Sequence, residues 1–380
     1  AGCITHASRL VYARVFGYAD IAARRPVEVT DLFRIASISK PITAIAILQL
    51  VEQGKLRLDD PVFEILDYTR EIEVLEEFDA RQREITIRHL LEHRGGWDRD
   101  ASFDPMFQSV RFAKELGVPP PAGPQHVIRA MLGQKLDFDP GEKYAYSNYG
   151  YCLLGRVIEK LTGRSYEDYV REHVLRPLGI TRMRIGHTRR DECGPDEVRF
   201  YHPILDDSVF EADLGQTVPS PYGGWYLEAM DSHGGWLASA VDIARLASAF
   251  DAPDHCPILS RESIEAMYAR PPGLAGYDDA GKEKETFYSL GWFNRVIGQG
   301  RINHWHSGSL PGTATFMLRR HDGHNIVILC NSRTSPHAES LGREIDRQAH
   351  IAADSVRAWP DLDRFPEFMA PKDPEPHAIP

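Results

Sequence analysis

The sequence of 380 residues is 42% hydrophobic and 26% charged, the balance of an ordinary globular protein. Its formal net charge of −11 at pH 7 argues against binding to nucleic acid, because phosphate contacts require clustered lysines and arginines. No apolar run approaches the roughly 20 residues that a helix needs to cross a bilayer, so no membrane span is predicted.

The chain begins at Ala1, within sequence typical of a strand, and we expect that a segment preceding it has been removed. Its five cysteines form an odd and sparse set without a Cys-x-x-Cys pair. This pattern favours core thiols, or one incidental disulfide, over a disulfide framework.

In chain order, the first predicted strand covers Arg9–Asp20, which is rich in β-branched and aromatic residues. A helix is predicted over residues 37–53 and ends at Gly54; it is apolar nearly all round, which indicates a buried position. Helical stretches alternate with loops over residues 61–236, and a further amphipathic helix is expected at residues 239–250. Strand patterns return in the segments FYSLGWFNRVIG, TATFMLRR and NIVILCNS.

Strand patterns at both ends of the chain therefore flank a helical middle, which predicts an α/β protein with a helical insertion. We predict an α/β domain formed by residues 1–60 and 237–356 and a helical domain of residues 61–236. Residues 357–380, rich in proline and aspartate, are predicted to be a surface tail.

The segment FRIASISKPITAIAILQL places Ser37 one helical turn before Lys40. A Ser-x-x-Lys pair is expected by chance about once in a chain of this length, so the spacing alone fits a nucleophile with its base and an ordinary polar helix start equally well. At a helix start both side chains share one face, and the amine can take the serine proton. Burial beside another cation would lower the lysine pKa from about 10.4 toward neutrality, as a base requires.

The segment YAYSNYGY offers a second group of candidates, because Tyr146 and Asn148 follow a predicted turn and precede a helix. A tyrosine in this position can carry a proton to a leaving group, and an asparagine amide can bind substrate. Taken alone, the triplet also fits a tyrosine that is simply packed into a loop.

The segment HWHSGSLPGTATFML contributes His306, Gly308 and Ser309. Small residues at positions 308 and 309 allow a substrate to lie along a strand edge, where an exposed N–H can bind an oxyanion. His-x-Gly alone is a weak signal, because His93 and two other histidines begin the same pattern. The position of His306 before two strand-like segments near the C-terminus favours it.

The chain resembles the serine beta-lactamase-related family in five segments that follow the family's order: FRIASISKPITA, ITIRHLLEHRGGW, PGEKYAYSNYGYCLLGRVIEKLTGRSYEDYV, HGGWLASAVDIARLASAF and HSGSLPG. The family includes class C beta-lactamases, D-alanyl-D-alanine carboxypeptidases, D-aminopeptidases and related esterases. The resemblance extends from about Leu10 to Ser332. It implies a beta-lactamase/transpeptidase-like fold of the α/β (α+β) class, with an antiparallel sheet flanked by helices, an all-helical domain, and the active site between them.

The resemblance implies that Ser37 is the acylated nucleophile and that Lys40 and Tyr146 are the general acid/base pair. A small-molecule ester, an amide or a short peptide would be the substrate, with no metal and no organic cofactor. A periplasmic or secreted location is favoured by the family, although the chain shows no signal peptide.

The resemblance also implies a substrate-binding set, which consists of Asn148, His306, Gly308 and Ser309. The backbone N–H groups of Ser37 and Ser309 would form the oxyanion hole, where loss of one donor typically costs about 3 kcal/mol of barrier stabilisation.

The chain departs from class C beta-lactamases at His306-Ser307-Gly308, where those enzymes usually have Lys-Thr-Gly. A histidine with an ordinary pKa near 6.5 is mostly neutral at pH 7 and offers less charge to a substrate carboxylate than a lysine does. We therefore predict an esterase or a D-amino-acid peptidase with little or no beta-lactam turnover. A class C-like beta-lactamase is the alternative.

Two further alternatives follow from the sequence. In a metal hydrolase, His304 and His306 would point to one face of a strand as ligands, but no third ligand stands at a recognisable spacing. A non-catalytic binding relative would keep the fold and lose the chemistry, whereas Ser37 and Lys40 are both intact here.

Overall fold

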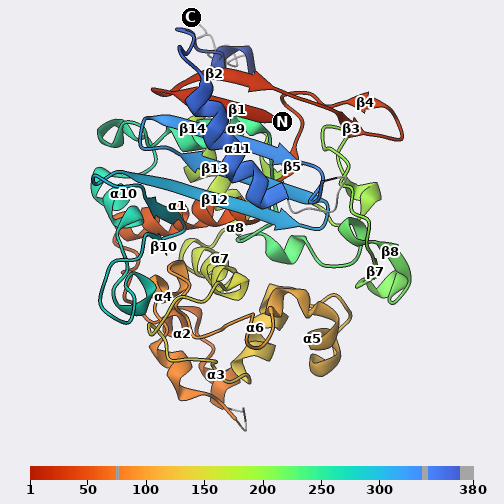
Figure 1. Ribbon diagram of the computed structural model, residues 1–380. Coiled ribbons are helices and arrows are strands. Elements are labelled where there is room, and N and C mark those ends of the chain that lie inside the picture. The colour runs from red at the N-terminus through yellow and green to blue at the C-terminus, as the bar shows by residue number, and fades with distance from the viewer. Residues whose placement is uncertain (74, 76, 336–340, 369–380) are drawn as a thin grey trace, which may run out of the picture.

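Both ends of the chain contribute strands to one seven-stranded antiparallel sheet, in the order β10-β11-β12-β13-β14-β1-β2 (Figure 1). The computed structural model describes residues 1–73, 75, 77–335 and 341–368. Gly2 of β1 lies opposite Ile328 of β14, which ties the start of the chain to the C-terminal strands. The strands of this sheet are β1 (Gly2–His6), β2 (Arg9–Arg14), β10 (Thr286–Tyr288), β11 (Phe293–Val296), β12 (Ile302–Leu310), β13 (Thr313–Arg319) and β14 (His324–Cys330).

The sheet separates two hydrophobic layers, because successive strand residues point to opposite faces. Phe316 and Leu318 of β13 pack with residues of α11 (Leu341–Ser355) on the outer face, where Figure 1 shows this helix crossing the sheet. Met317 between them belongs to the main core on the inner face, together with residues of α9 (Ala240–Ser248). Both faces of β13 are therefore buried.

α1 (Ser39–Glu52) crosses the main core directly after the 3₁₀ helix η1 (Ala36–Ile38). All its residues from Ser39 to Leu50 are buried, as the all-round apolar sequence predicts. The helix ends just before Gly54, whose φ of 66° lies in the left-handed region that glycine adopts without strain. The predicted buried helix and its glycine stop are confirmed.

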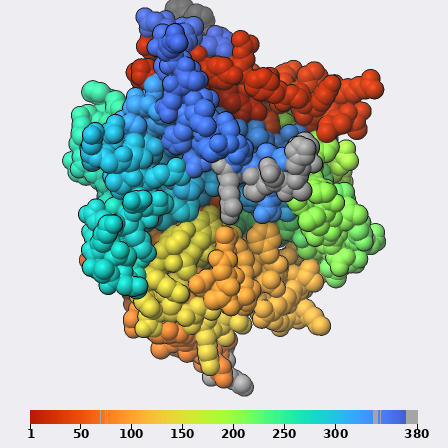
Figure 2. Space-filling model, in the orientation of Figure 1, coloured from red at the N-terminus to blue at the C-terminus, as the bar shows by residue number. Residues whose placement is uncertain are grey.

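The helical part of the molecule packs against α1 and lies below the sheet in Figure 1, coloured orange to yellow. Figure 2 shows it in contact with the C-terminal strands, coloured blue. Within the described residues, no helix is long and apolar enough to cross a membrane. The remaining α-helices are α2 (Val62–Leu66), α3 (Thr69–Glu73), α4 (Ile87–Leu91), α5 (Ser109–Leu116), α6 (Pro124–Leu132), α7 (Asn148–Thr162), α8 (Tyr166–Val170) and α10 (Arg261–Tyr268).

Three small sheets lie outside the large one. The strand predicted over Arg9–Asp20 is divided into β2 and β3, since Gly17, with a φ of 83°, lies between them. The segment predicted to be helical also holds β6, β7 and β8, which are too short for a sequence pattern. The strands of the small sheets are β3 (Tyr18–Asp20) with β4 (Arg25–Pro26), β5 (Phe33–Arg34) with β9 (Trp236–Ala238) and β6 (Arg184–Ile185), and β7 (Leu205–Asp207) with β8 (Thr217–Pro219).

One continuous hydrophobic cluster extends from β1 through α1 and α7 to α9 and β14. The domain boundaries near residues 60 and 236 thus stay a prediction. The predicted tail is anchored at its start, because the Arg364 N–H donates to Leu10 O at 2.9 Å and Phe365 is buried. Residues 369–380 of that tail lie outside the described residues.

Candidate active site

Ser37 stands where β5 passes into η1, at a point of unusual backbone geometry. Ala36, directly before it, has a φ of 49°, a left-handed conformation that costs a non-glycine residue on the order of 1 kcal/mol or more. The carbonyl oxygen of Ile35 accepts a hydrogen bond from Thr315 Oγ1 of β13 at 2.8 Å. The backbone before Ser37 is thereby fixed to the sheet.

Lys40 is completely buried one turn further along, and three acceptors surround its amine. Nζ lies 3.2 Å from Ser37 Oγ, 2.8 Å from Asn148 Oδ1 and 3.0 Å from the backbone oxygen of His233. Burial lowers the pKa of Lys40 well below its ordinary value; the nearby Asp104 carboxylate opposes this shift.

The three partners of Lys40 define what its neutral form does. Asn148 Oδ1 and the His233 carbonyl oxygen can only accept hydrogen bonds, so they take both N–H groups of a neutral amine. The remaining lone pair then faces Ser37 Oγ, which can donate its proton. This arrangement suits a base that removes the proton from the serine.

Tyr146 also lies at the site, and its ring packs among charged and aromatic groups. Lys40 Nζ is 4.7 Å and Arg99 Cζ 4.6 Å from its ring centroid. Burial raises the pKa of Tyr146, although a hydrogen bond with Ser37 acts in the opposite direction. The phenol therefore holds its proton at neutral pH. The fully buried His93 ring is tilted against the Tyr146 ring, with 4.2 Å between the ring centroids, and its Nδ1 accepts the Ser147 N–H at 3.2 Å.

Asn148 is the first residue of α7, which begins there because Ser147 caps it by accepting the Gly150 N–H. Its Oδ1 accepts from Lys40, and its Nδ2 donates to Asp104 Oδ2 at 2.6 Å. An amide nitrogen has two N–H groups, so one N–H of Asn148 has no partner among the described residues.

Gly308 allows β12 to approach η1 more closely than a side chain would permit. A Cβ at this position would lie 2.2 Å from both Ile35 O and Thr315 Oγ1. Ser309, next along β12, is exposed and borders the same hollow as Ser37. The glycine therefore sets the spacing between Ser37 and Ser309, the two residues whose N–H groups are predicted to bind an oxyanion.

His306 forms part of the wall of the site, and only 1% of it is exposed. Its Nδ1 lies 2.8 Å from Ser307 O, which can only accept, so the proton resides on Nδ1. Its Nε2 lies 3.1 Å from the Tyr288 hydroxyl, which then donates. Burial, with a further contribution from Lys40, lowers the pKa of His306 to about 3. Both ring nitrogens of a neutral histidine are thus used within the protein.

Two hollows meet at Ser37. One, of about 300 Å³, is lined by Asn148, Met230 and Ser309 among others. The second, of about 460 Å³, is lined by Tyr146 and His306, and Ser37 and Arg99 border both. A substrate carbonyl at Ser37 would therefore direct its two halves into different surroundings.

The structure brings all the predicted site residues together around these hollows: Ser37, Lys40, Tyr146, Asn148, His306, Gly308 and Ser309. Sequence reasoning missed Arg99, Asp104, His233 and the packing role of His93. Arg99 and Asp104 lie in irregular segments without a periodic pattern, and the single signal for His93 was a His-x-Gly triplet shared with other histidines.

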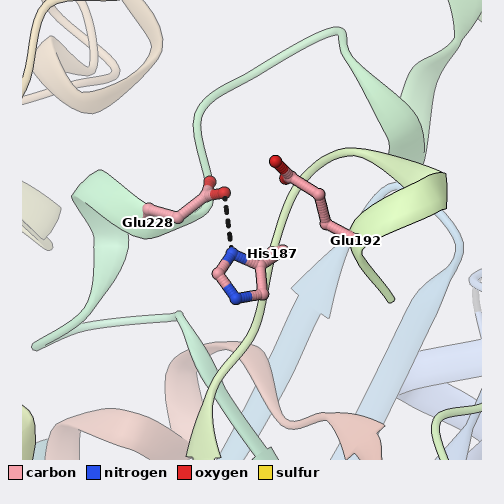
Figure 3. Close-up of side chains that lie close together, drawn as sticks. All are labelled: His187, Glu192 and Glu228. Atoms are coloured by element: carbon pink, nitrogen blue, oxygen red, sulfur yellow. Dashed lines mark ion pairs between the residues drawn. The ribbon is translucent and has the colours of Figure 1, made fainter. Parts of the chain in front are cut away.

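Among the described residues, one group could offer three metal-ligand atoms within 4.8 Å of one another, and Figure 3 shows its members: His187, Glu192 and Glu228. His187 Nδ1 lies 3.5 Å from Glu228 Oε1. His187 and Glu192 are exposed, and Thr188 donates to Glu228 through its backbone N–H and its hydroxyl. These contacts explain the position of Glu228 without an ion. His304, the ligand considered with His306, instead pairs with Asn294 Oδ1 at 2.7 Å.

The sheet with its two helical layers and the buried Ser-x-x-Lys pair define a beta-lactamase/transpeptidase-like protein of the serine hydrolase superfamily. The chain belongs to the family described as Beta-lactamase, which matches residues 1–350. The predicted family and fold class are confirmed.

Among curated proteins, the chain is 28% identical over 332 residues to penicillin-binding protein 4* of Bacillus subtilis (strain 168), covering 85% of this chain and 66% of that protein. The chain spans from 52% to 66% of the length of the first curated relatives that it matches.

Among solved structures, an octameric penicillin-binding protein homologue from Pyrococcus abyssi is similar with a TM-score of 0.68 and 26% identity, over 93% of this chain and 72% of that chain. A D-amino acid amidase from Ochrobactrum anthropi SV3, solved with D-phenylalanine, is similar with a TM-score of 0.65 and 22% identity, over 93% of this chain and 94% of that chain. The latter likeness concerns the fold alone.

Proposed function

We propose that this protein hydrolyses esters or amides of small molecules or short peptides through an acyl-enzyme on Ser37. The observation that carries the proposal is the contact of 3.2 Å between Ser37 Oγ and the buried amine of Lys40. A serine hydroxyl becomes a useful nucleophile only when a neighbouring base takes its proton, and the lowered pKa of Lys40 makes the amine such a base.

Acylation begins when Ser37 Oγ attacks the substrate carbonyl carbon and passes its proton to Lys40 Nζ. The carbonyl oxygen becomes an oxyanion that accepts hydrogen bonds from the Ser37 and Ser309 N–H groups. When the bond to the leaving group breaks, Tyr146 donates its hydroxyl proton to the departing oxygen or nitrogen, and Lys40 returns a proton to Tyr146. The acyl group remains on Ser37.

Deacylation uses water and the same groups in reverse. Tyr146 and Lys40 accept the proton of a water molecule whose oxygen attacks the acyl carbon, and Ser37 Oγ leaves with a proton. One water is consumed, and its hydroxyl group goes to the acid product. Its other proton goes to Ser37 Oγ, where it replaces the proton that the alcohol or amine took during acylation. The opposite directions of the Lys40 and Tyr146 pKa shifts, lowered and raised, suit these roles.

We further propose that the substrate is an ester or a D-amino-acid peptide or amide, and that beta-lactam turnover is slight. Supporting this choice, the D-amino acid amidase of Ochrobactrum anthropi shares the fold, and the wall position expected to hold a lysine in a class C beta-lactamase is His306. A buried, neutral and fully paired His306 offers no permanent cation to a beta-lactam carboxylate.

The test is labelling by a fluorophosphonate probe, read by intact mass, together with turnover of p-nitrophenyl esters, D-amino-acid amides and a chromogenic cephalosporin. Ser37→Ala is expected to abolish labelling and to lower turnover by about 10⁴-fold or more. Ser355→Ala, at the exposed end of α11, is the control and should keep both. Labelling of the Ser37→Ala variant, or efficient cephalosporin turnover with negligible ester and amide turnover, would contradict the proposal.

A further inference from the structure

The two hollows at Ser37 take different halves of a substrate. If Tyr146 protonates the leaving group, as proposed above, the leaving group must lie in the hollow that Tyr146 lines. The acyl group then occupies the other hollow, which Asn148 lines and Tyr146 does not. We name these the leaving-group hollow and the acyl hollow.

The acyl hollow is positively charged. Arg99 and Arg333 line it, and its described lining residues include no aspartate or glutamate. Arg99 is partly neutralised by Asp104 and Asp100, at 3.8 and 4.0 Å. Arg333 is exposed, and within the described ranges no carboxylate lies within ion-pair distance of it. Among the described residues its guanidinium thus has no carboxylate partner, and it can pair with an anion.

The rest of the acyl hollow has both polar and apolar wall: Asn148 and Ser309 line it together with Phe107, Met230 and Leu310. A substrate group that fits this lining has an apolar stem and carries a negative charge that the guanidinium of Arg99 or Arg333 can meet.

The leaving-group hollow is the more acidic of the two, although Arg99 borders both. Asp98 and Asp100 line it, and Tyr144 and Phe293 provide aromatic wall. Lys143 Nζ approaches Asp98 at 3.6 Å and offsets part of the charge. A leaving group with its own carboxylate, such as a C-terminal D-alanine, would face these two aspartates. A neutral aromatic leaving group suits this hollow.

We propose that the preferred substrates are half-esters or half-amides of dicarboxylic acids, in which the acyl group ends in a carboxylate and the leaving group is uncharged. This inference rests on the proposed function, because it takes the direction of the acyl group from the role of Tyr146. Hydrolysis consumes one water and yields the free dicarboxylate and the alcohol or amine.

The experiment compares kcat/KM for two pairs of esters that differ only by a methyl cap on the carboxylate. The first pair is mono-p-nitrophenyl adipate and its methyl ester, with the charge in the acyl group. The second is 4-carboxyphenyl pentanoate and its methyl ester, with the charge in the leaving group. We expect the charged adipate to be preferred about tenfold over its capped form, because a charge-assisted hydrogen bond is gained. We expect the second pair to show the reverse preference.

Arg333→Gln tests the source of the preference, and Arg14→Gln on the exposed face of β2 is the control with the same change in net charge. The ratio between the charged and capped adipates is expected to fall toward one in Arg333→Gln and to persist in Arg14→Gln. It should also shrink when ionic strength rises from about 0.01 M to about 1 M, where the Debye length falls from about 30 Å to about 3 Å.

The outcomes separate this inference from the proposed function. If the probe labels Ser37 and the capped adipate is hydrolysed as well as the charged one, the inference is wrong and the acyl-enzyme mechanism stands. An adipate preference that survives in Arg333→Gln would equally overturn the inference. If neither the probe nor any of the esters acylates Ser37, the proposed function fails and the inference fails with it.

Discussion

The two faces of the seven-stranded sheet are covered in opposite ways. On the inner face, the buried amine of Lys40 meets three polar partners, which orient it in the proposed mechanism. On the outer face, α11 covers apolar side chains, and a hollow of about 550 Å³ there is lined by groups such as Ile4, Ile326 and Trp359. None of the predicted site residues lines this larger hollow. The two smaller hollows are lined by Ser37, Tyr146, Asn148, His306 and Ser309.

Substitutions on the two faces are therefore expected to change different properties of the protein. An atom changed on the inner face alters a hydrogen-bonded network, in which one displaced partner removes the chemistry. An atom changed on the outer face alters packing, which affects the free energy of unfolding and leaves the chemistry in place. The predictions below test this contrast.

The largest effect is expected from Lys40→Met. It removes the proposed base and should lower kcat/KM by about 10³-fold to 10⁴-fold. The free energy of unfolding should change little, because an apolar side chain of similar length fills the space of a buried amine. Steady-state kinetics and thermal melts measure the two quantities.

Tyr146→Phe sharpens this test, because it retains the ring and removes the hydroxyl. If Lys40 and Tyr146 act as one proton-transfer unit, the double variant loses little more activity than either single variant. If the two single-variant losses of kcat/KM multiply in the double variant, Lys40 and Tyr146 act independently. Near-normal kinetics of Tyr146→Phe would likewise show that the hydroxyl transfers no proton.

A smaller loss is expected from Gly308→Ala. Its Cβ would collide with Ile35 O at 2.2 Å and separate β12 from η1, so the two predicted oxyanion donors move apart. We expect kcat to fall about 100-fold, the effect of losing one such donor. Gly2→Ala on β1 is the matched control, since its Cβ would meet its nearest neighbour at an ordinary 3.8 Å. Equal activity of the two variants would refute the role of Gly308.

The pH profile should change in a direction that the charges near Lys40 fix. Activity requires the neutral amine, so kcat/KM rises with pH through the lowered pKa of Lys40. The Asp104 carboxylate raises this pKa and Arg99 lowers it. Asp104→Asn should therefore move the inflection to lower pH, and Arg99→Gln to higher pH. Inflections that move together in the two variants would show that another group is being titrated.

The smallest effect on activity is expected on the outer face. Leu318→Ala should reduce the free energy of unfolding by about 2–5 kcal/mol while kcat/KM stays unchanged. Its neighbour Met317, fully buried on the inner face, provides the comparison: Met317→Ala should lower both quantities. Urea titration and kinetics below the unfolding transition distinguish the two. Loss of kcat/KM in folded Leu318→Ala would remove the contrast between the faces.

The elements with a regular pattern could be predicted from the sequence. The all-round apolar run of α1 and its stop at Gly54 predicted the buried helix. Ser37 and Lys40 lie within a single helical turn, so their proximity follows from local geometry. Their proximity to Tyr146 and His306 joins residues far apart in the chain, which no local pattern predicts. It was expected from the order of the motifs, through the resemblance to a family.

The rest of the site could not be predicted, because it depends on tertiary contacts that no local sequence pattern encodes. Arg34 is an example: a charged residue predicts an exposed position, yet this one is buried. Its guanidinium donates to Pro221 O at 2.7 Å and to His187 O at 2.9 Å, and so holds two distant loops beside β5. Arg99 and Arg333 likewise define the acyl hollow only after folding brings their loops to Ser37.

The pairing of Gly2 with Ile328 has a consequence for how the protein is made. The first strands emerge from the ribosome long before their partner exists, and at about 5–20 residues per second the wait is on the order of tens of seconds. Contacts of such high sequence separation form late. Ser37 and Lys40 are synthesised early, whereas Ser309 and Thr315, which donates to the Ile35 carbonyl oxygen, come near the end. A nascent chain therefore carries the proposed nucleophile before the proposed oxyanion site exists.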